Sequence, residues 1–349
     1  GRGTRIGRLA ARLRRTGRMD YVVRQFPDTD NVALIMKTDK DNPKGISRRD
    51  ALKRMGLFMV GTVALSMPSL ASCSEDKKKR IILYFTATGN SLYVARQLAD
   101  ENTELFSIPQ LVKEGKYEFE ADEIGIVYPI YGQMPPNMVR GFLSKARLEA
   151  PYRFAVLTYG NGKMVATSLF DELTRKLGKP FHYVTSILMV DNFLPAFDMN
   201  EQIKIDKHIP ESLARIQSDL KERKRWIEPS ESPDFEPFRA FLAFRGLNME
   251  EGYLLRSEKC FVVQEKSCIG CGVCTQVCPR GNYELTSQGV KTEGDCDFCF
   301  ACIQNCPQKA IVFAKDSGYP VLAHGERNPN ARFRNEHVSL WSIKESNRQ

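Results

Sequence analysis

Between residues 81 and 190 the chain alternates short, continuous apolar runs with stretches of mixed character. The runs are rich in Ile, Val, Leu and Phe, as strands buried on both faces of a sheet are. They occupy residues 81–85, 124–130, 154–160 and 182–190. Two stretches between them, at 90–99 and 166–177, repeat apolar residues at helical spacing. Strands that alternate with helices predict βαβ units, so we expect an α/β domain with a doubly wound parallel sheet over residues 81–195.

The rest of the chain falls into segments of different composition. Residues 196–255 are charged and mostly helical in pattern, and they predict a connector with a Pro/Ser/Glu-rich part at 228–237. Residues 256–317 hold nearly all of the cysteines, and residues 318–349 form a polar tail with little pattern. We expect the cysteine-rich segment to be a second, small α+β domain.

The positive charge of the chain is confined to its N-terminal part. The 349 residues carry a formal net charge of +9. Residues 1–72 hold 15 Lys/Arg and 6 Asp/Glu, while residues 73–349 hold 36 of each class. The basic segment also lacks interleaved aromatic residues and any nucleic-acid-binding motif. We therefore expect no nucleic-acid partner.

The basic segment has the features of an export leader. Arg48 and Arg49 precede an apolar run from Leu57 to Ala71. The run is about 15 residues long, which is shorter than the ~20 residues of a spanning helix. The flanks resemble a twin-arginine signal, and the residues up to Cys73 resemble a bacterial lipobox. The resemblance implies an exported lipoprotein that a lipid on Cys73 anchors to the periplasmic, extracytoplasmic side of a membrane; an ordinary signal peptide with an incidental cysteine is the alternative.

We therefore divide the N-terminal part into three segments. Residues 36–72 form the signal with its lipobox, and residues 73–80 form a polar tether. Met36 is a credible start, which would make residues 1–35 an upstream artefact, and a short basic arm is the alternative. Twin-arginine export in general moves folded proteins, often with a cofactor inserted, so the leader itself implies a cofactor.

Eight of the ten cysteines form two copies of the pattern C-x2-C-x2-C-x3-C-P. The first copy is Cys268, Cys271, Cys274 and Cys278, and the second is Cys296, Cys299, Cys302 and Cys306. Three thiolates at this spacing can hold three corners of a [4Fe-4S] cluster, and the fourth thiolate comes from the other copy. One cluster would then use Cys268, Cys271, Cys274 and Cys306, and the other would use Cys296, Cys299, Cys302 and Cys278.

Zinc knuckles and disulfides are the alternatives for these cysteines. Zinc sites use two pairs of ligands and often include His, whereas each copy here has a cysteine triplet and no nearby His. Exported proteins often form disulfides, but folding before export resolves that conflict. The pattern closely resembles that of bacterial two-cluster ferredoxins. Cys260 lies outside both copies, and we expect it to be a half-buried thiol.

A second motif follows the first apolar run directly. Residues 86–91 read Thr-Ala-Thr-Gly-Asn-Ser, between a predicted strand and a predicted helix. Such a turn offers backbone N–H groups, hydroxyl groups and a helix N-terminus to one phosphate. It contains neither the Gly-Lys-Ser/Thr of an ATP site nor the G-x-G-x-x-G of an NAD site. The motif matches the flavodoxin loop that holds the FMN phosphate, and an ordinary polar turn is the alternative. The residues concerned are Thr86, Ala87, Thr88, Gly89, Asn90 and Ser91.

Two further loops would meet this one at the carboxyl ends of the strands, where a doubly wound sheet binds its ligand. Both follow predicted strands and contain Tyr and Gly. The residues we assign to the flavin site there are Tyr131, Gly132, Thr158, Tyr159 and Gly160. Tyr131 and Tyr159 are placed to stack on the two faces of the flavin ring, and a core or surface role is the alternative for each.

The order of leader, flavodoxin-like domain, connector and two-cluster ferredoxin resembles the bacterial and archaeal family of flavodoxin–ferredoxin fusion proteins. The resemblance covers about residues 81–340 and includes residues 189–195 and 331–335. It implies two [4Fe-4S] clusters and one FMN in a single chain, which would make electron relay between them intramolecular. The leader departs from many such fusions, which look cytoplasmic, and this departure leaves the partner open.

We expect electron transfer, with a redox protein or a small electron donor or acceptor as the partner. The alternative is a flavin-dependent reductase of a small molecule or quinone, supplied with electrons by the clusters. No acid or base stands out, because the four His residues are scattered along the chain. Asp191 and Asn192 follow the last predicted strand and could face the flavin, but we expect a turn role for both.

Overall fold

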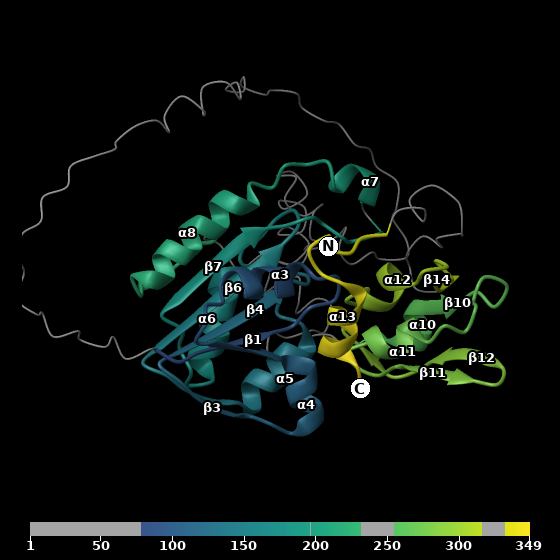
Figure 1. The fold of residues 1–349 in the computed structure, drawn as a ribbon, viewed down its shortest axis with the longest axis horizontal. Coiled ribbons are helices and arrows are strands. Elements are labelled where there is room, and N and C mark those ends of the chain that lie inside the picture. Colours follow the sequence, from purple (N-terminus) through teal and green to yellow (C-terminus); the bar gives the residue numbers. More distant parts are fainter. Residues whose placement is uncertain (1–77, 196, 232–254, 316–331) are drawn as a thin grey trace, which may run out of the picture. The chain divides into compact units, whose positions relative to one another are not determined.

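The computed structural model describes residues 78–195, 197–231, 255–315 and 332–349. Its largest element is a six-stranded sheet in the order β2-β1-β4-β6-β7-β8, in which every neighbouring pair is parallel (Figure 1). The strands are β1 (Arg80–Tyr84), β2 (Thr103–Ser107), β4 (Glu123–Pro129), β6 (Tyr152–Tyr159), β7 (Tyr183–Leu188) and β8 (Trp226–Ile227). The first five strands of the sheet in chain order stand in the spatial order 2-1-3-4-5, which is that of flavodoxins.

The four apolar runs are confirmed as the central strands β1, β4, β6 and β7 of this sheet. Their side chains are almost entirely buried, because helices cover the sheet on both sides as the pattern predicts. The sequence pattern missed the two edge strands. β2 is half-exposed and carries a glutamate near its middle, and β8 is only two residues long.

Helices follow the strands along the chain. They are α3 (Asn90–Gln97), α4 (Ile108–Glu114), α5 (Asn137–Lys145), α6 (Ala166–Lys176), α7 (Met199–Gln202) and α8 (Ile209–Lys221). A separate parallel pair is formed by β3 (Glu118–Glu120) and β5 (Arg147–Glu149). Helix α8 packs against β7, and β8 pairs with β7. The first part of the predicted connector 196–255 therefore adds a helix and an edge strand to the sheet.

The cysteine-rich segment forms short antiparallel pairs and short helices. Its elements are β9 (Leu255–Arg256), α10 (Ser257–Cys260), β10 (Phe261–Val263), α11 (Val273–Val277), β11 (Tyr283–Thr286), β12 (Gly289–Thr292), β13 (Asp295–Cys296), α12 (Ala301–Asn305) and β14 (Ile311–Phe313). The pairs are β10 with β14, β11 with β12, and β13 with β9. Each copy of the cysteine motif runs into one short helix, α11 in the first copy and α12 in the second, and these two helices contact each other.

The polar tail ends in helix α13 (Leu340–Asn347), which the sequence pattern did not predict. This helix contacts α4 of the sheet domain and α11 of the cysteine-rich segment, beside which it lies in Figure 1. Small polar side chains make these contacts. Asn347 is fully buried, and its Nδ2 donates to the carbonyl oxygens of Thr86 at 2.9 Å and Val277 at 3.1 Å. One side chain therefore joins the loop after β1 to the first cysteine motif.

All of the described residues belong to one compact unit. Its main apolar core contains strand residues such as Leu83 together with Val277 and Ala301 of the cysteine-rich segment and Ile343 of α13. Among the described residues, none of the helices has the length and apolar content needed to cross a membrane. The predicted segments 1–35 and 36–72 and the residue Cys73 lie outside the described residues.

The contacts of Asn347 predict a loss of stability when its side chain is removed. Asn347→Ala would leave two buried carbonyl oxygens without their donor, so we expect the free energy of unfolding to fall by about 1–3 kcal/mol. Urea unfolding measures this change. Lys344→Ala, at a position of the same helix that points away from these carbonyls, is the control and should change it by less than about 0.5 kcal/mol. Equal stabilities of the two variants would contradict a joining role for Asn347.

Candidate cofactor sites

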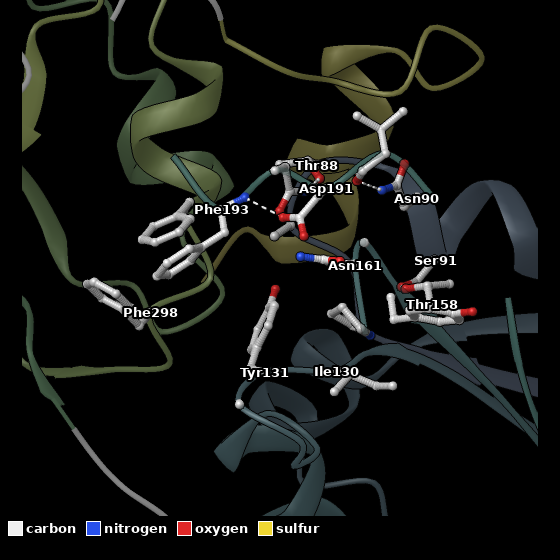
Figure 2. Close-up of a pocket in the computed structure, with 18 of the residues that line it drawn as sticks. Thr88, Asn90, Ser91, Ile130, Tyr131, Thr158, Asn161, Asp191, Phe193 and Phe298 are labelled. Atoms are coloured by element: carbon white, nitrogen blue, oxygen red, sulfur yellow. Dashed lines mark hydrogen bonds between the residues drawn. The ribbon is translucent and has the colours of Figure 1, made fainter. Parts of the chain in front are cut away.

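A cleft opens at the carboxyl ends of β1, β4, β6 and β7 (Figure 2). It encloses about 900 Å³, including its open mouth. Ten of the eleven residues assigned from the sequence to a flavin site line it, so the structure brings the three predicted loops together. They are Thr86, Ala87, Thr88, Asn90, Ser91, Tyr131, Gly132, Thr158, Tyr159 and Gly160. The eleventh, Gly89, shapes the first loop and does not line the cleft.

The loop 86–91 is a tight turn into helix α3. Gly89 stands before the helix with φ +102°, a conformation that glycine adopts without strain. Its N–H donates to Thr86 Oγ1 at 3.1 Å. Because the first turn of a helix leaves its N–H groups without intrahelical partners, the start of α3 presents donors at this end of the cleft. The hydroxyl groups of Ser91 and Thr158 lie 2.9 Å apart and tie this loop to the loop after β6.

Side chains from distant segments hold the loop in place. Asn192 Nδ2 donates to Thr88 Oγ1 at 2.5 Å, and Asn305 Nδ2 donates to the carbonyl oxygen of Ala87 at 3.3 Å. The backbone N–H of Asn335 donates to the carbonyl oxygen of Thr88 at 2.8 Å. Asn192 therefore braces the loop rather than serving only a turn, and residues of the cysteine-rich segment and of the tail complete the same frame.

Aromatic side chains line the remaining wall of the cleft. Figure 2 shows Tyr131, Phe193 and Phe298 around it, and Tyr159 and Phe300 line it as well. Desolvation raises the pKa of the half-buried Tyr159, so its phenol stays protonated at neutral pH. We missed Phe193, Phe298 and Phe300 in the sequence. The available signal was the pair of phenylalanines between cysteines, at positions where the first copy of the motif has glycines.

Asp191 is the acidic side chain in the lining of the cleft. Its Oδ1 accepts a hydrogen bond from the N–H of Phe193 at 2.9 Å. Desolvation by the surrounding protein raises the pKa of its carboxyl group. Gly160 packs directly against it, since a Cβ atom on Gly160 would lie 2.4 Å from Asp191 Cα. The nearby Lys207 is buried, and burial lowers the pKa of its ammonium group.

The structure groups the cysteines across the two copies as the spacing predicts. Cys306 of the second copy lies close enough to Cys274 to raise the pKa of that thiol, as Cys271 also does, although burial is the larger cause; together they raise it to about 11. Cys278 of the first copy acts in the same way on Cys302, again after burial. The two sets differ in exposure. The set of Cys268, Cys271, Cys274 and Cys306 is half-buried or exposed, whereas Cys296, Cys299, Cys302 and Cys278 are all buried.

Backbone donors point at several of these sulfur atoms. The N–H groups of Asn282, Phe298 and Ala310 donate to Cys278 Sγ at 3.5 Å, Cys296 Sγ at 3.3 Å and Cys306 Sγ at 3.3 Å. Such donors stabilise negative charge on sulfur, which suits thiolate ligands of a cluster. The nine described cysteines carry free thiols. Within the described ranges no three His, Cys, Asp or Glu side chains gather closely enough for a single metal ion.

The buried set lines a small pocket of its own. Its wall contains Cys278, Cys296, Cys299 and Cys302, together with Tyr283 and Phe300. The Tyr283 side chain faces Cys302, and burial is the main reason that the pKa of its phenol lies well above the usual value. A protonated phenol is a hydrogen-bond donor beside this thiol. The unassigned Cys260 is buried rather than half-buried, and burial raises the pKa of its thiol to about 11.

Asp297 fixes the second motif against the sheet domain. Its side chain is fully buried. It accepts hydrogen bonds from Arg280 Nε at 2.7 Å and from the N–H of Met138, near the start of α5, at 3.1 Å. A buried carboxylate with a guanidinium and a backbone donor is costly to displace. The loop that follows Cys296 is therefore held at the rim of the cleft.

Comparison with known families identifies a 4Fe-4S dicluster domain at residues 260–307. The match contains all eight cysteines of the two copies. The probable iron–sulfur protein of the Frd operon of Proteus vulgaris is 30% identical over 81 residues, which cover 18% of this chain and 52% of that protein. The chain thus spans about half the length of this curated relative. The domain match and the grouping of the thiols show that the cysteine-rich segment is a two-cluster iron–sulfur domain.

Two solved structures resemble the α/β part. A flavoprotein from Lactobacillus acidophilus NCFM, solved in complex with FMN, is 18% identical and covers 31% of this chain and 93% of its own, with a TM-score of 0.23. Rubredoxin oxygen:oxidoreductase from Desulfovibrio gigas is 17% identical and covers 40% of this chain and 36% of its own, with a TM-score of 0.27. At these scores the likeness carries no argument about a ligand, and the flavodoxin-like fold rests on the strand order.

The raised pKa of Asp191 predicts a pH dependence of stability. The folded protein retains a proton on this carboxyl group at a pH where the unfolded chain, with an ordinary pKa of about 3.9, has released it. Stability from this group is therefore complete below about pH 4 and is lost as the pH rises through the raised value. Asp191→Asn keeps an acceptor for the N–H of Phe193 but carries no charge.

We expect Asp191→Asn to gain stability relative to the wild type as the pH rises above about 4, measured by urea unfolding from acidic to neutral pH. Asp198→Asn is the matched control, because Asp198 Oδ1 also accepts from the N–H two residues ahead, that of Asn200, at 2.9 Å. The control should not show this rise. A constant difference for Asp191→Asn across the pH range would contradict the prediction.

Proposed function

We propose that this protein is an electron-transfer iron–sulfur flavoprotein that relays electrons between its two [4Fe-4S] clusters and a bound FMN. The observation that carries the proposal is the position of the second cysteine motif. Phe298 and Phe300, which lie between its cysteines, line the same cleft as the phosphate-loop residues Thr86 to Ser91. A flavin in the cleft and a cluster on this motif would therefore be neighbours.

The fit of the cleft to FMN is supported by its donors and its walls. The start of α3 and the hydroxyl groups of Thr86, Thr88 and Ser91 suit a phosphate group. Tyr131, the loop after β6 and the phenylalanines suit the flat, apolar body of a flavin ring. When bound, FMN would supply two-electron chemistry that can also proceed in single-electron steps, whereas each cluster carries one electron.

The exposure of the cysteines suggests the order of the relay. The exposed Cys271 and its half-buried partners place the first cluster at the surface, within reach of a redox protein or a small donor or acceptor. The buried set beside the cleft would place the second cluster next to the flavin. The chain's own contribution is to hold the three groups in line and to keep the inner two away from water.

A second candidate is a flavin-dependent reductase of a small molecule or quinone, fed by the clusters. Asp191 favours it, because a half-buried carboxyl group with a raised pKa inside the cleft could hold a proton beside the flavin. Steady-state turnover of quinones or other small acceptors under a cluster-reducing donor tests it. A loss of turnover in Asp191→Asn, with FMN still bound, would support this candidate over a pure carrier.

We also propose that the protein is exported through a twin-arginine route and anchored by a lipid on Cys73. The proposal rests on Arg48, Arg49 and the lipobox-like residues before Cys73. Mass spectrometry of the protein from its native host tests it directly. A mature N-terminus at diacylglyceryl-Cys73 is the expected result, and an unmodified Cys73 within a longer chain would overturn it.

The cofactor content is the first test of the proposed function. Anaerobic reconstitution should load two clusters, detected as eight iron atoms by metal analysis and as reduced-cluster signals by EPR, and one FMN, detected by absorbance. Protein that binds both clusters but no FMN would remove the flavin from the proposal. Protein without iron would overturn it entirely.

The phosphate loop predicts a difference between FMN and riboflavin, which lacks the phosphate. Thr88→Val removes one hydroxyl donor to the charged phosphate, so we expect FMN binding to weaken roughly 10- to 100-fold while riboflavin binding stays unchanged. Fluorescence titration measures both. Thr167→Val is the matched control, since the Thr167 hydroxyl is buried without a hydrogen-bond partner among the described residues and does not line the cleft. Equal weakening for both flavins would contradict a phosphate contact.

A further inference from the structure

The two copies of the cysteine motif share an unusual backbone shape at two matching positions. In the first copy Gly270 and Gly272 have φ +65° and φ +69°. In the second copy the matching residues are Phe298 and Phe300, with φ +52° and φ +63°. Gly272 and Phe300 each stand immediately before the short helix of their copy. The loop therefore needs the left-handed conformation in both copies, but it holds glycines in one and phenylalanines in the other.

Glycine is the residue that this loop accepts without strain. A bulky residue in the left-handed region is strained, and such strain collects at functional sites. Lack of space does not explain the glycines of the first copy. A Cβ atom would come no closer than 3.8 Å to its neighbours at either Gly270 or Gly272. The loop geometry thus favours glycine in both copies, and the two phenylalanines must be explained by what their rings do.

The two rings stand where the two cofactor pockets meet. Phe298 and Phe300 both line the cleft that carries the phosphate loop. Phe300 also lines the pocket of the buried cysteines, so a single side chain is shared by both walls. The ring centroids of Phe298 and Phe300 lie 4.7 Å apart, and that of Phe193, another residue of the cleft, lies 5.6 Å from Phe300. Apolar rings therefore fill the space between the two pockets.

We propose that Phe298 and Phe300 are positioning residues that set the flavin ring against the second cluster and keep the gap between them free of water. The inference rests on the proposed function, because it requires FMN in the cleft. Each electron that crosses the gap leaves a reduced cluster, which is oxidised, and reduces the flavin by one electron. Two such transfers complete the reduction, and an external one-electron donor replaces the electrons at the clusters.

Ordinary core packing is the competing explanation for these rings. Phe298 and Phe300 are 7% and 3% exposed and pack with Phe261 and Phe313 in one aromatic cluster. Loss of any of these rings would disturb the domain. A test must therefore separate an effect on the flavin from an effect on packing. Phe313 provides the control, because it is equally buried in the same cluster but does not line the cleft.

The experiment compares Phe298→Leu, Phe300→Leu and Phe313→Leu with the wild type, each loaded with both clusters. Leucine keeps most of the apolar volume but has no flat ring. We measure the FMN dissociation constant by titration and the rate at which dithionite-reduced clusters pass electrons to FMN by stopped-flow absorbance. The first two variants should weaken FMN binding roughly tenfold and slow its reduction severalfold, with iron content unchanged. Phe313→Leu should stay within about twofold of the wild type in both.

The outcomes separate this inference from the proposed function. A wild-type protein that carries its iron but binds no FMN would overturn both. A wild type that binds FMN, with Phe298→Leu and Phe300→Leu matching it in affinity and rate, would overturn this inference alone. Equal defects in all three variants would assign the rings to packing and would also overturn it. If Phe300→Leu fails to hold its clusters, Phe298→Leu decides the result, since that ring lines the cleft but not the cysteine pocket.

Discussion

The buried carbonyl groups of the phosphate loop are the constraint on which the rest of the structure depends. A buried carbonyl needs a donor, and here the donors come from far along the chain. The carbonyl oxygens of Thr86, Ala87 and Thr88 accept from Asn347, Asn305 and the backbone of Asn335 in turn. A loop that would be self-sufficient in an isolated α/β domain is thus completed by the cysteine-rich segment and the tail. The sheet and the iron–sulfur domain are consequently parts of one cooperative structure.

Local patterns predicted the central sheet and the cysteine sets, because both are written in short stretches of sequence. Strands buried on both faces show as continuous apolar runs, and cluster ligands show as a fixed spacing. The elements that failed to show depend on distant contacts. Helix α13 packs through small polar side chains such as Asn347, so it lacks an apolar stripe. Phe298 and Phe300 look like ordinary core residues until their backbone conformation is seen, and Asn192 looks like a turn residue until its contact with Thr88 is seen.

The two cluster sites differ in a way that suits a relay. Cys271 is exposed at the surface, whereas Cys299 and Cys302 are buried beside the cleft. A duplicated motif has therefore produced one site open to a partner and one site enclosed by protein. Asp297 maintains this arrangement, because its carboxylate is paired with Arg280 and also reaches the start of α5. The asymmetry lies in the surroundings of the ligands and not in the ligands themselves.

The long reach of these hydrogen bonds has a consequence for how the protein is made. Asn347 pairs with Thr86 across 261 positions of the chain, and Asn335 pairs with Asn90 across 245. A ribosome has to release nearly the whole chain before the loop acquires its donors. The α/β part therefore leaves the tunnel with an unfinished nucleotide site, and that site is completed only after the cysteine-rich segment has emerged. Biogenesis is thus ordered, with flavin capture as a late event that reports a fully synthesised chain.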